Sequence, residues 1–345
     1  MKVTTKPFGT TYSGKNVALI RLENDAGMYA EITNYGATLV SLGVPGANGD
    51  CTDVVLGFDS VRGYEDTRYY MGATIGRHAG QIKKGRFTLG ETQYSVVVND
   101  HDHTMHGGPD GFHHQVFGWC ASDGQVDFFY LSPDGEAGFP GNLQVTVRYQ
   151  LTKTNELVME YFAQSDRDTV LNMTNHSYFN LDGKGDILGH RLRIEASAYT
   201  QVDDQGLPTG KILPVKGTPY DFSEFSVLGA QIDCEDEQLK WCGGYDHNWV
   251  LNPAPKGQLR LACELQDTAG KTKMKLFTNQ PGLQMYSGNY MDGKEKGKQQ
   301  CAYGYRGALC LEPQLFPNGM ECPNFPSPVL KAGQPFYYHS MYQFV

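Results

Sequence analysis

The segment LQVTVRYQL, at residues 143–151, alternates apolar and polar residues, and ELVMEYFAQ at 156–164 repeats the pattern four residues later. Successive side chains of a β-strand point to opposite faces, so this alternation predicts two half-buried strands. The same pattern recurs in NVALIRLEN (16–24), RLRIEASAY (191–199) and QPFYYHSMYQF (334–344). Long helical periodicity is nearly absent, and residues 223–232 alone predict a short helix.

Glycine-rich turns separate the predicted strands. Examples are SPDGEAG (132–138), LDGKGD (181–186), QDTAGK (266–271) and MDGKEKG (291–297). Short strands joined by such turns are typical of all-β proteins, and this number of them predicts a large antiparallel β-sandwich. Neither a repeat of fixed period nor a low-complexity linker interrupts the chain. We therefore expect one domain over residues 1–345.

Composition restricts the class of partner. The 345 residues carry a formal net charge of −9, and their 29 Lys and Arg residues are scattered rather than clustered. Nucleic acid and anionic membranes are therefore poor partners. The amino-terminal residues lack the apolar core of a signal peptide, and no stretch approaches the roughly 20 apolar residues of a membrane span. The eight cysteines form no C-x-x-C pair, and without an export signal we expect reduced thiols and a cytoplasmic location. We also expect a monomer or homodimer.

Three histidines stand close together in HDHTMHGG, at residues 101–108. In an extended chain His101 and His103 share one face, and His106 points to the other. One flat strand therefore cannot present all three to a metal ion, and we expect no metal site here. The pair Gly107 and Gly108 predicts a tight turn, which would place His106 at a strand end beside a cleft.

Three further segments place polar residues inside apolar frames. They are LNMTNHSYFNLDG (171–183) with His176 and Asn180, CGGYDHNWVL (242–251) with Asp246, and GALCLEPQLFPN (307–318) with Glu312. Each has a structural reading: a hydrogen-bonded core histidine, a turn cap, or a solvent-exposed strand end. Together they predict a pocket to which several strands each contribute one group. Partial burial in such a pocket raises a carboxyl pKa and lowers that of an imidazole.

Such a pocket suits proton transfer on a small, polar, neutral substrate. Aromatic residues near these segments could stack on the C–H face of a sugar; they are Trp119, Tyr178, Phe179, Trp249 and Tyr286. The chain contains neither a P-loop nor the G-x-S-x-G motif of a serine nucleophile.

These segments resemble the aldose 1-epimerases, a family also called galactose mutarotases. The resemblance runs almost end to end, through NYGATLVSLGVP (34–45), DVVLGF (53–58), GATIGRHAGQI (72–82), MHGG (105–108), NMTNHSYFNL (172–181), GGYDHNWVL (243–251), TNQPGLQMYSGNY (278–290) and GALCLEPQLFPN (307–318). It implies that the fold is a large antiparallel β-super-sandwich. It also implies an enzyme that interconverts the α and β anomers of free hexoses such as galactose and glucose, without a cofactor.

The resemblance also implies roles for single residues. Glu312 is similar to the base that removes the proton of the C1 hydroxyl, and His176 is similar to the acid that protonates the ring oxygen. His106, Asp246 and Gln284 match positions that bind the sugar. We add Asn180, from the same motif as His176, as a further predicted contact.

One position departs from the family pattern. Many members carry G-R-x-A-N-R-I where this chain has GRHAGQI, so Gln81 replaces an arginine that donates hydrogen bonds to sugar hydroxyls. Arg77 matches the first arginine, which is not the usual substrate contact. Gln81 can still donate through its amide, as a neutral group instead of a charged fork, and we predict that it contacts the substrate.

Three alternatives stay open at the level of sequence. An epimerase of phosphorylated hexoses would need a cluster of basic residues at the pocket. A non-catalytic sugar-binding protein would have no need of both Glu312 and His176. A metal enzyme of the cupin type would use the histidine cluster. The preferred aldose is open as well.

Overall fold

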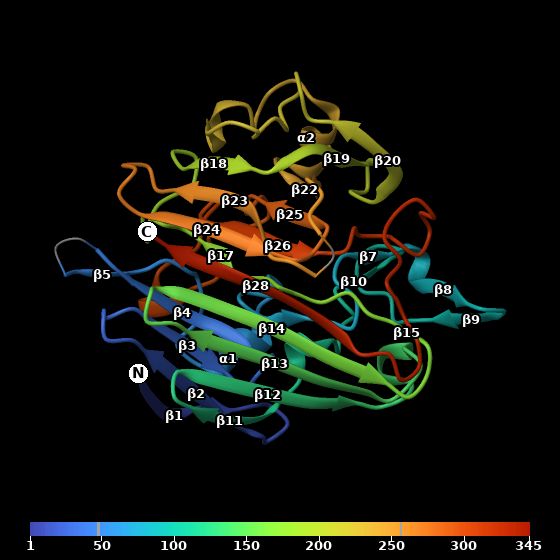
Figure 1. Cartoon of the computed structure of the whole chain (residues 1–345), viewed down its shortest axis with the longest axis horizontal. Coiled ribbons are helices and arrows are strands. Elements are labelled where there is room, and N and C mark those ends of the chain that lie inside the picture. Colours follow the sequence, from blue (N-terminus) through green and yellow to red (C-terminus); the bar gives the residue numbers. More distant parts are fainter. Residues whose placement is uncertain (47–48, 256) are drawn as a thin grey trace.

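The fold is known from a computed structural model that describes residues 1–46, 49–255 and 257–345. Three antiparallel sheets make up most of it (Figure 1). The largest contains nine strands in the order β11 (Gly118–Ser122), β12 (Gln125–Ser132), β13 (Leu143–Leu151), β14 (Glu156–Ser165), β28 (Phe336–Phe344), β24 (Lys273–Thr278), β23 (Arg260–Gln266), β18 (Arg191–Ile194) and β21 (Ser226–Val227). The predicted all-β antiparallel fold is confirmed.

A five-stranded sheet is formed by the amino-terminal part of the chain, in sequence order: β1 (Lys2–Thr10), β2 (Asn16–Glu23), β3 (Tyr29–Thr33), β4 (Thr38–Pro45) and β5 (Cys51–Asp53). A six-stranded sheet has the order β17 (Tyr178–Phe179), β26 (Leu309–Gln314), β25 (Gly282–Tyr286), β22 (Asp246–Leu251), β19 (Ala196–Val202) and β20 (Pro208–Pro214). This third sheet carries Asp246, Gln284 and Glu312, three of the polar residues that the sequence singled out.

Short elements complete the described structure. Four two-stranded pairs are β6 (Thr74–Ile75) with β16 (Thr174–Asn175), β7 (Gln81–Ile82) with β10 (Thr104–Met105), β8 (Arg86–Leu89) with β9 (Thr92–Ser95), and β15 (Thr169–Val170) with β27 (Val329–Leu330). The α-helices are α1 (Val61–Asp66) and α2 (Glu237–Cys242), and single 3₁₀ turns occupy Lys83–Gly85, Phe112–His114, Glu136–Gly138, Leu228–Ala230 and Lys298–Gln300. None of the helices in the described part of the chain has the length and apolarity that a bilayer span requires.

Two expectations about local structure need correction. Residues 223–232 are not a helix: they contain β21 and a 3₁₀ turn, since the backbone of Leu228 and Gly229 bonds to the 188–190 segment. The helix begins instead after Asp236, whose carboxylate accepts hydrogen bonds from the backbone N–H groups of Gln238 and Leu239. The segment 191–199 is two strands, β18 and β19, which belong to different sheets.

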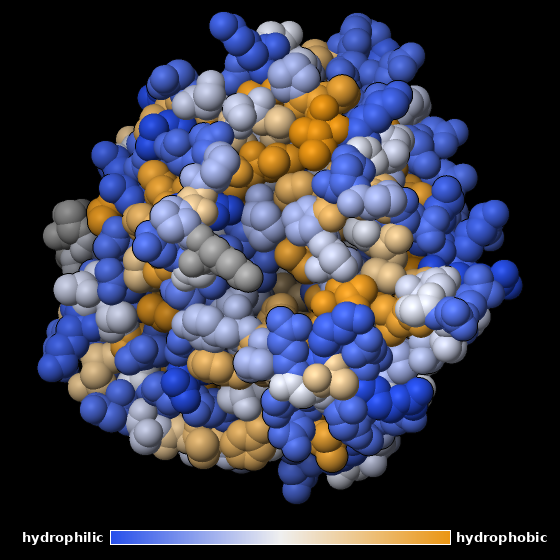
Figure 2. All heavy atoms as spheres, turned by 45° about the vertical axis from the view of Figure 1, so that its right-hand side comes forward, coloured by the Kyte–Doolittle hydropathy of each residue, from blue (hydrophilic) through white to orange (hydrophobic). Residues whose placement is uncertain are grey.

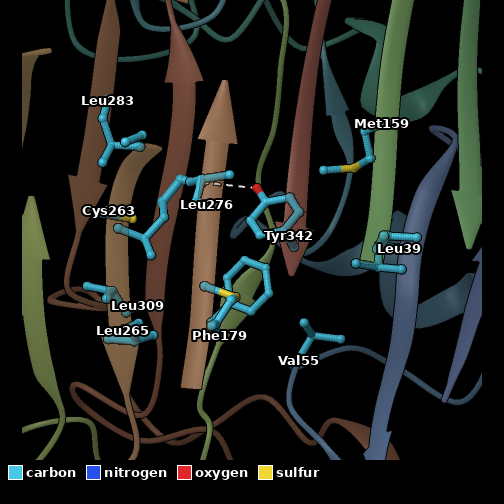
Figure 3. Close-up of a cluster of buried hydrophobic side chains, with 14 of the residues drawn as sticks. Leu39, Val55, Met159, Phe179, Cys263, Leu265, Leu276, Leu283, Leu309 and Tyr342 are labelled. Atoms are coloured by element: carbon cyan, nitrogen blue, oxygen red, sulfur yellow. Dashed lines mark hydrogen bonds between the residues drawn. The ribbon is translucent and has the colours of Figure 1, made fainter. Parts of the chain in front are cut away.

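One apolar cluster joins the sheets. It includes Leu39 of β4, Met159 of β14, Phe179 of β17 and Leu309 of β26, which point toward the same interior (Figure 3). The hydroxyl of Tyr342 on β28 donates to the Leu311 carbonyl at 3.3 Å, so a polar group in this interior is satisfied. Each such large side chain contributes about 1.5–3 kcal/mol on burial.

Strand β26 is buried along its whole length, because both of its faces are covered. Leu309 points to the apolar interior (Figure 3), and Leu311 belongs to the same apolar cluster. By the alternation of a strand, Cys310, Glu312 and Gln314 must point the other way. The burial of this carboxylate therefore follows from its position in a central strand.

Candidate active site

A cavity of about 790 Å³ lies over the polar face of the six-stranded sheet. Strands β7 and β10 and the loops around residues 68–70, 99–101 and 204–208 complete its wall. These elements lie toward the right-hand side of Figure 1, the side that Figure 2 turns forward; there the surface is hollowed, with apolar residues beside polar ones. The cavity is large enough to surround a small polar molecule.

Strand register aligns the polar residues on the cavity floor. Asn248 of β22 pairs with Gln284 of β25, which pairs with Glu312 of β26. In the adjacent row, Asp246 pairs with Tyr286. Since directly paired residues of antiparallel strands share a face, three segments distant in sequence place their side chains side by side.

Glu312 and His176 form the centre of the floor. The Glu312 carboxylate lies 3.7 Å from Nε2 of His176, and the two residues are only 1% and 6% exposed. The sulfur of Cys310 lies 3.5 Å from the other ring nitrogen, Nδ1. One side of the imidazole thus faces the carboxylate, while its other side is held by the neighbouring strand residue.

Burial shifts both titrations toward the uncharged forms. It raises the pKa of the Glu312 carboxyl well above its ordinary value, with a further contribution from the Asp246 charge. It lowers the pKa of His176 to about 4. Shifts of this kind, in two adjacent groups within a cavity, are typical of acid/base sites.

His106 reaches the cavity from the turn after β10, as the sequence predicted. It has a positive φ of 53°, and Gly107 follows with a φ of 85°. A Cβ at Gly107 would collide with the Gly76 carbonyl oxygen, so only glycine fits this turn. Nδ1 of His106 accepts a hydrogen bond from the Gly80 N–H at 3.2 Å, which leaves Nε2 available to a ligand.

The His106 ring packs edge-on against His176, with ring centroids 5.2 Å apart. Burial, together with the neighbouring His176 and His113, lowers the pKa of His106 well below its ordinary value. The ring is therefore neutral at pH 7. A neutral imidazole with Nδ1 accepting carries its proton on Nε2 and can donate it in a hydrogen bond.

Asp246 and Gln284 are joined directly. The Gln284 Nε2 donates to the Asp246 carboxylate at 2.8 Å. Burial raises the pKa of Asp246 to about 6, although this hydrogen bond opposes the shift. The Gln284 Oε1 has no hydrogen-bond partner among the described protein groups. The pair can therefore accept hydrogen bonds from a bound molecule.

Gln81 and Arg77, from the same GRHAGQI motif, differ in their position relative to the cavity. Gln81 lines the cavity, with its Nε2 at 3.5 Å from the Gly206 carbonyl. Arg77 is buried away from it and donates to Ser132, Pro133 and Pro140.

The prediction for Asn180 needs correction. Strand β17 ends at Phe179, and the Asn180 Nδ2 donates to the carbonyls of Lys184, Gly185 and Gly307. These three bonds use the amide to hold a loop, and Asn180 is not among the described residues that line the cavity. Asn180 therefore supports the loop and lies outside the described lining of the cavity.

The histidine cluster does not converge. His101 is exposed and pairs with Asp100, whereas the two ring nitrogens of His103 contact Lys84 N and Gln205 Oε1 at 3.1 and 3.0 Å. Within the described ranges, the group whose possible ligand atoms lie close enough for a metal is His176, Cys310 and Glu312, on the cavity floor.

The aromatic lining was only partly predicted. Tyr178 and Tyr286 line the cavity, but Phe179 and Trp249 are core residues and Trp119 packs against the core. Tyr70 was missed; its ring lies edge-on against His106 with centroids 4.8 Å apart. Trp241 and Tyr290, both partly exposed at the cavity, were also missed. Trp241 is an isolated aromatic residue in a short helix, whereas Tyr290 ends a motif whose only singled-out aromatic residue was Tyr286.

Comparisons with known proteins found relatives that match nearly the whole chain. The sequence model of the family described as aldose 1-epimerase matches residues 18–343. The chain is 38% identical to galactose mutarotase of Mus musculus, covering 100% of this chain and 99% of that protein. It is 34% identical to aldose 1-epimerase of Escherichia coli (strain K12), covering 96% of each. The structure of galactose 1-epimerase from Lactobacillus acidophilus NCFM superposes with a TM-score of 0.88 at 30% identity, covering 100% of this chain and 98% of that one.

Proposed function

Since this chain belongs to the aldose 1-epimerase family, we propose that Glu312 and His176 are the base and the acid with which it interconverts the α and β anomers of free aldohexoses. The activity places the protein among the isomerases. The observation that carries the assignment of the two residues is their geometry: a buried carboxylate and a buried imidazole 3.7 Å apart on the floor of the cavity.

The reaction needs one proton removed and one added. Glu312 takes the proton of the C1 hydroxyl while the bond between C1 and the ring oxygen breaks, and His176 gives a proton to that oxygen. The free aldehyde rotates about the C1–C2 bond. The reverse transfers then close the ring on the other face, so both groups return to their starting states. Each positioned group contributes roughly 10²–10⁴-fold.

Of the two protonation states in this cycle, burial favours the one that follows ring opening. Ring opening starts from ionised Glu312 with protonated His176 and ends with neutral Glu312 and neutral His176. Burial favours the uncharged state of both groups, as the raised pKa of Glu312 and the lowered pKa of His176 indicate. The cavity thus stabilises the open-chain stage relative to the ion pair. One shared proton is sufficient, because the net charge of the pair is constant throughout.

The surrounding polar groups hold the sugar over the pair. His106 offers an N–H, while Asp246 and the free Oε1 of Gln284 accept from hydroxyls. Tyr70, Tyr178 and Tyr286 provide apolar faces beside them. Gln81 contributes a neutral amide at the cavity edge.

A free hexose fits this cavity better than a phosphorylated one. Arg68 is the one Lys or Arg side chain among the described lining residues, and it lies at the rim, 67% exposed. Lys83, Lys84 and Arg86 do not line the cavity. A phosphate would therefore meet neutral amides and carboxylates instead of the cationic groups that it requires.

Two further expectations belong to this proposal. All eight cysteines are unpaired, which supports a reducing, cytoplasmic location. The shared apolar cluster supports treatment of residues 1–345 as one catalytic domain. The assembly as monomer or homodimer stays a prediction.

Polarimetry tests the function directly. Freshly dissolved α-D-galactose and α-D-glucose should relax to anomeric equilibrium faster with the protein than without it, and EDTA should leave the added rate unchanged. Heat-denatured protein at the same concentration is the control. If the intact protein accelerated neither sugar, the proposal would fail; if EDTA abolished the rate, the metal-free assignment would fail.

We expect Gln81→Arg to lower the Michaelis constant for galactose. A guanidinium donates charge-assisted hydrogen bonds where the amide donates neutral ones, which is worth on the order of 1–2 kcal/mol, or roughly 5–30-fold. Gln93→Arg adds the same charge on an exposed part of β9 and should leave KM unchanged. A KM for Gln81→Arg that is unchanged or higher than that of the native protein would show that residue 81 does not contact the sugar.

A further inference from the structure

Two buried amides on the cavity floor have polar atoms without partners. Asn248 and Gln314 are each 1% exposed, and both line the cavity. Neither Oδ1 nor Nδ2 of Asn248, nor Oε1 of Gln314, has a hydrogen-bond partner among the described protein groups. Buried polar atoms are nearly always hydrogen-bonded, so such a cluster at a cavity indicates groups that bind a ligand.

The sheet itself positions these amides. Asn248 lies opposite Gln284, and Gln314 lies opposite Gly282 on the same central strand, β25. A Cβ at Gly282 would overlap the Asn248 Oδ1 and lie 3.0 Å from the Gln314 backbone oxygen. Glycine at this position leaves the room that the Asn248 side chain occupies between the two neighbouring strands.

The chemistry of the two amides matches hydroxyl groups. Asn248 offers both a donor and an acceptor, and Gln314 offers an acceptor. A hydroxyl donates one hydrogen bond and accepts others, so it can satisfy both types of atom. Thr200, Pro208 and Pro317, which also line the cavity, are uncharged, and no Lys or Arg side chain other than Arg68 is among the described lining residues. A charged substituent would have no counter-ion there.

We propose that Asn248 and Gln314 form a second hydroxyl-binding subsite, which selects aldoses by hydroxyls other than the anomeric one. The inference rests on the proposed function and extends it from the reacting centre to the rest of the sugar. Gln314 lies two residues beyond Glu312 on β26, roughly 7 Å along the strand, and Asn248 lies two strands away, roughly 10 Å across the sheet. A pyranose whose C1 is at Glu312 extends over this area.

Nearly isosteric apolar variants test the subsite. We expect Asn248→Leu and Gln314→Met each to raise KM for galactose about tenfold while kcat changes less than threefold, because a hydrogen bond to the sugar is lost away from the reacting atoms. The thermal midpoint without sugar should stay the same or rise, since each variant removes an unsatisfied buried polar group. Gln144→Met, on the exposed face of β13, is the matched control.

Deoxy sugars separate a binding role from a structural one. Wild-type kcat/KM should fall about tenfold for the aldose that lacks the recognised hydroxyl, tested with the 2-, 3-, 4- and 6-deoxy analogues of one parent hexose. In the matching variant the same deoxygenation should cost less than threefold, because its protein partner is already absent. Equal losses for every sugar in wild type and variants would overturn the inference, as would an unchanged KM in both variants.

Different results would reject the hydroxyl-binding subsite and the proposed acid/base function. If the wild type epimerised galactose but Asn248→Leu and Gln314→Met kept its KM, the subsite would be wrong and the acid/base assignment unaffected. If the wild type epimerised no sugar, calorimetric titration with galactose would still compare its affinity among the three proteins. Equal affinities would then overturn the subsite, and weaker binding to the variants would support it.

Discussion

Glu312→Gln should lower kcat for galactose by about 10²–10⁴-fold, down to a rate near that of the uncatalysed relaxation. The amide has the same shape as the carboxylate and can still form hydrogen bonds, but it cannot accept the proton of the C1 hydroxyl. Since the native residue is only 1% exposed, no solvent-exposed base replaces it directly. Initial rates of polarimetric relaxation, corrected for the buffer-catalysed rate, provide the measurement.

The same variant should fold normally. Burial raises the pKa of Glu312, so the ionised carboxylate is disfavoured in the cavity, and a neutral amide removes that cost. Glu91→Gln alters an exposed carboxylate by the same change and should retain full activity. A Glu312→Gln protein that kept more than a tenth of the wild-type kcat would move the base elsewhere, with Asp246 the first residue to consider.

The strands were predictable because one of their faces is buried. β13 and β14 alternate buried and more exposed residues along nearly their whole length, so a period of two is visible in the sequence. The residues of β26 were recognisable as an apolar segment. The strand shows no period of two in its burial, since both of its faces are covered. The sequence does not indicate the break between β18 and β19, because the period of two continues where the chain passes from one sheet to another.

The proposed acid and base residues stood out in the sequence for a different reason. Glu312 and His176 stand in apolar frames and in motifs shared with a known family, whereas their distance depends on strand register, which sequence periodicity does not give. Asn180 stands in the same kind of frame but is not among the described lining residues of the cavity, and its amide is bonded to loop carbonyls. Asn248 and Gln314 were missed since polar residues in strands are common, and only the structure reveals that their partners are absent.

His176→Gln should lower kcat by about 10²–10³-fold and leave the equilibrium affinity for galactose within about threefold of wild type. Glutamine keeps an N–H near the position of Nε2, so it can still donate a hydrogen bond to the ring oxygen. It cannot release the proton. His339→Gln, on β28 and outside the described cavity lining, controls for the loss of an imidazole.

The pH profile of this variant distinguishes an acid from a group that only orients the sugar. The native pair works while it holds one proton, so its kcat should fall as pH rises through the raised pKa at which that proton leaves. In His176→Gln the residual rate requires only ionised Glu312, so it should rise with pH to a plateau after subtraction of the hydroxide-catalysed background. An alkaline decline that persisted in the variant would assign the acid to another residue, and the neutral imidazole of His106, with its ring centroid 5.2 Å from that of His176, would be the next to replace.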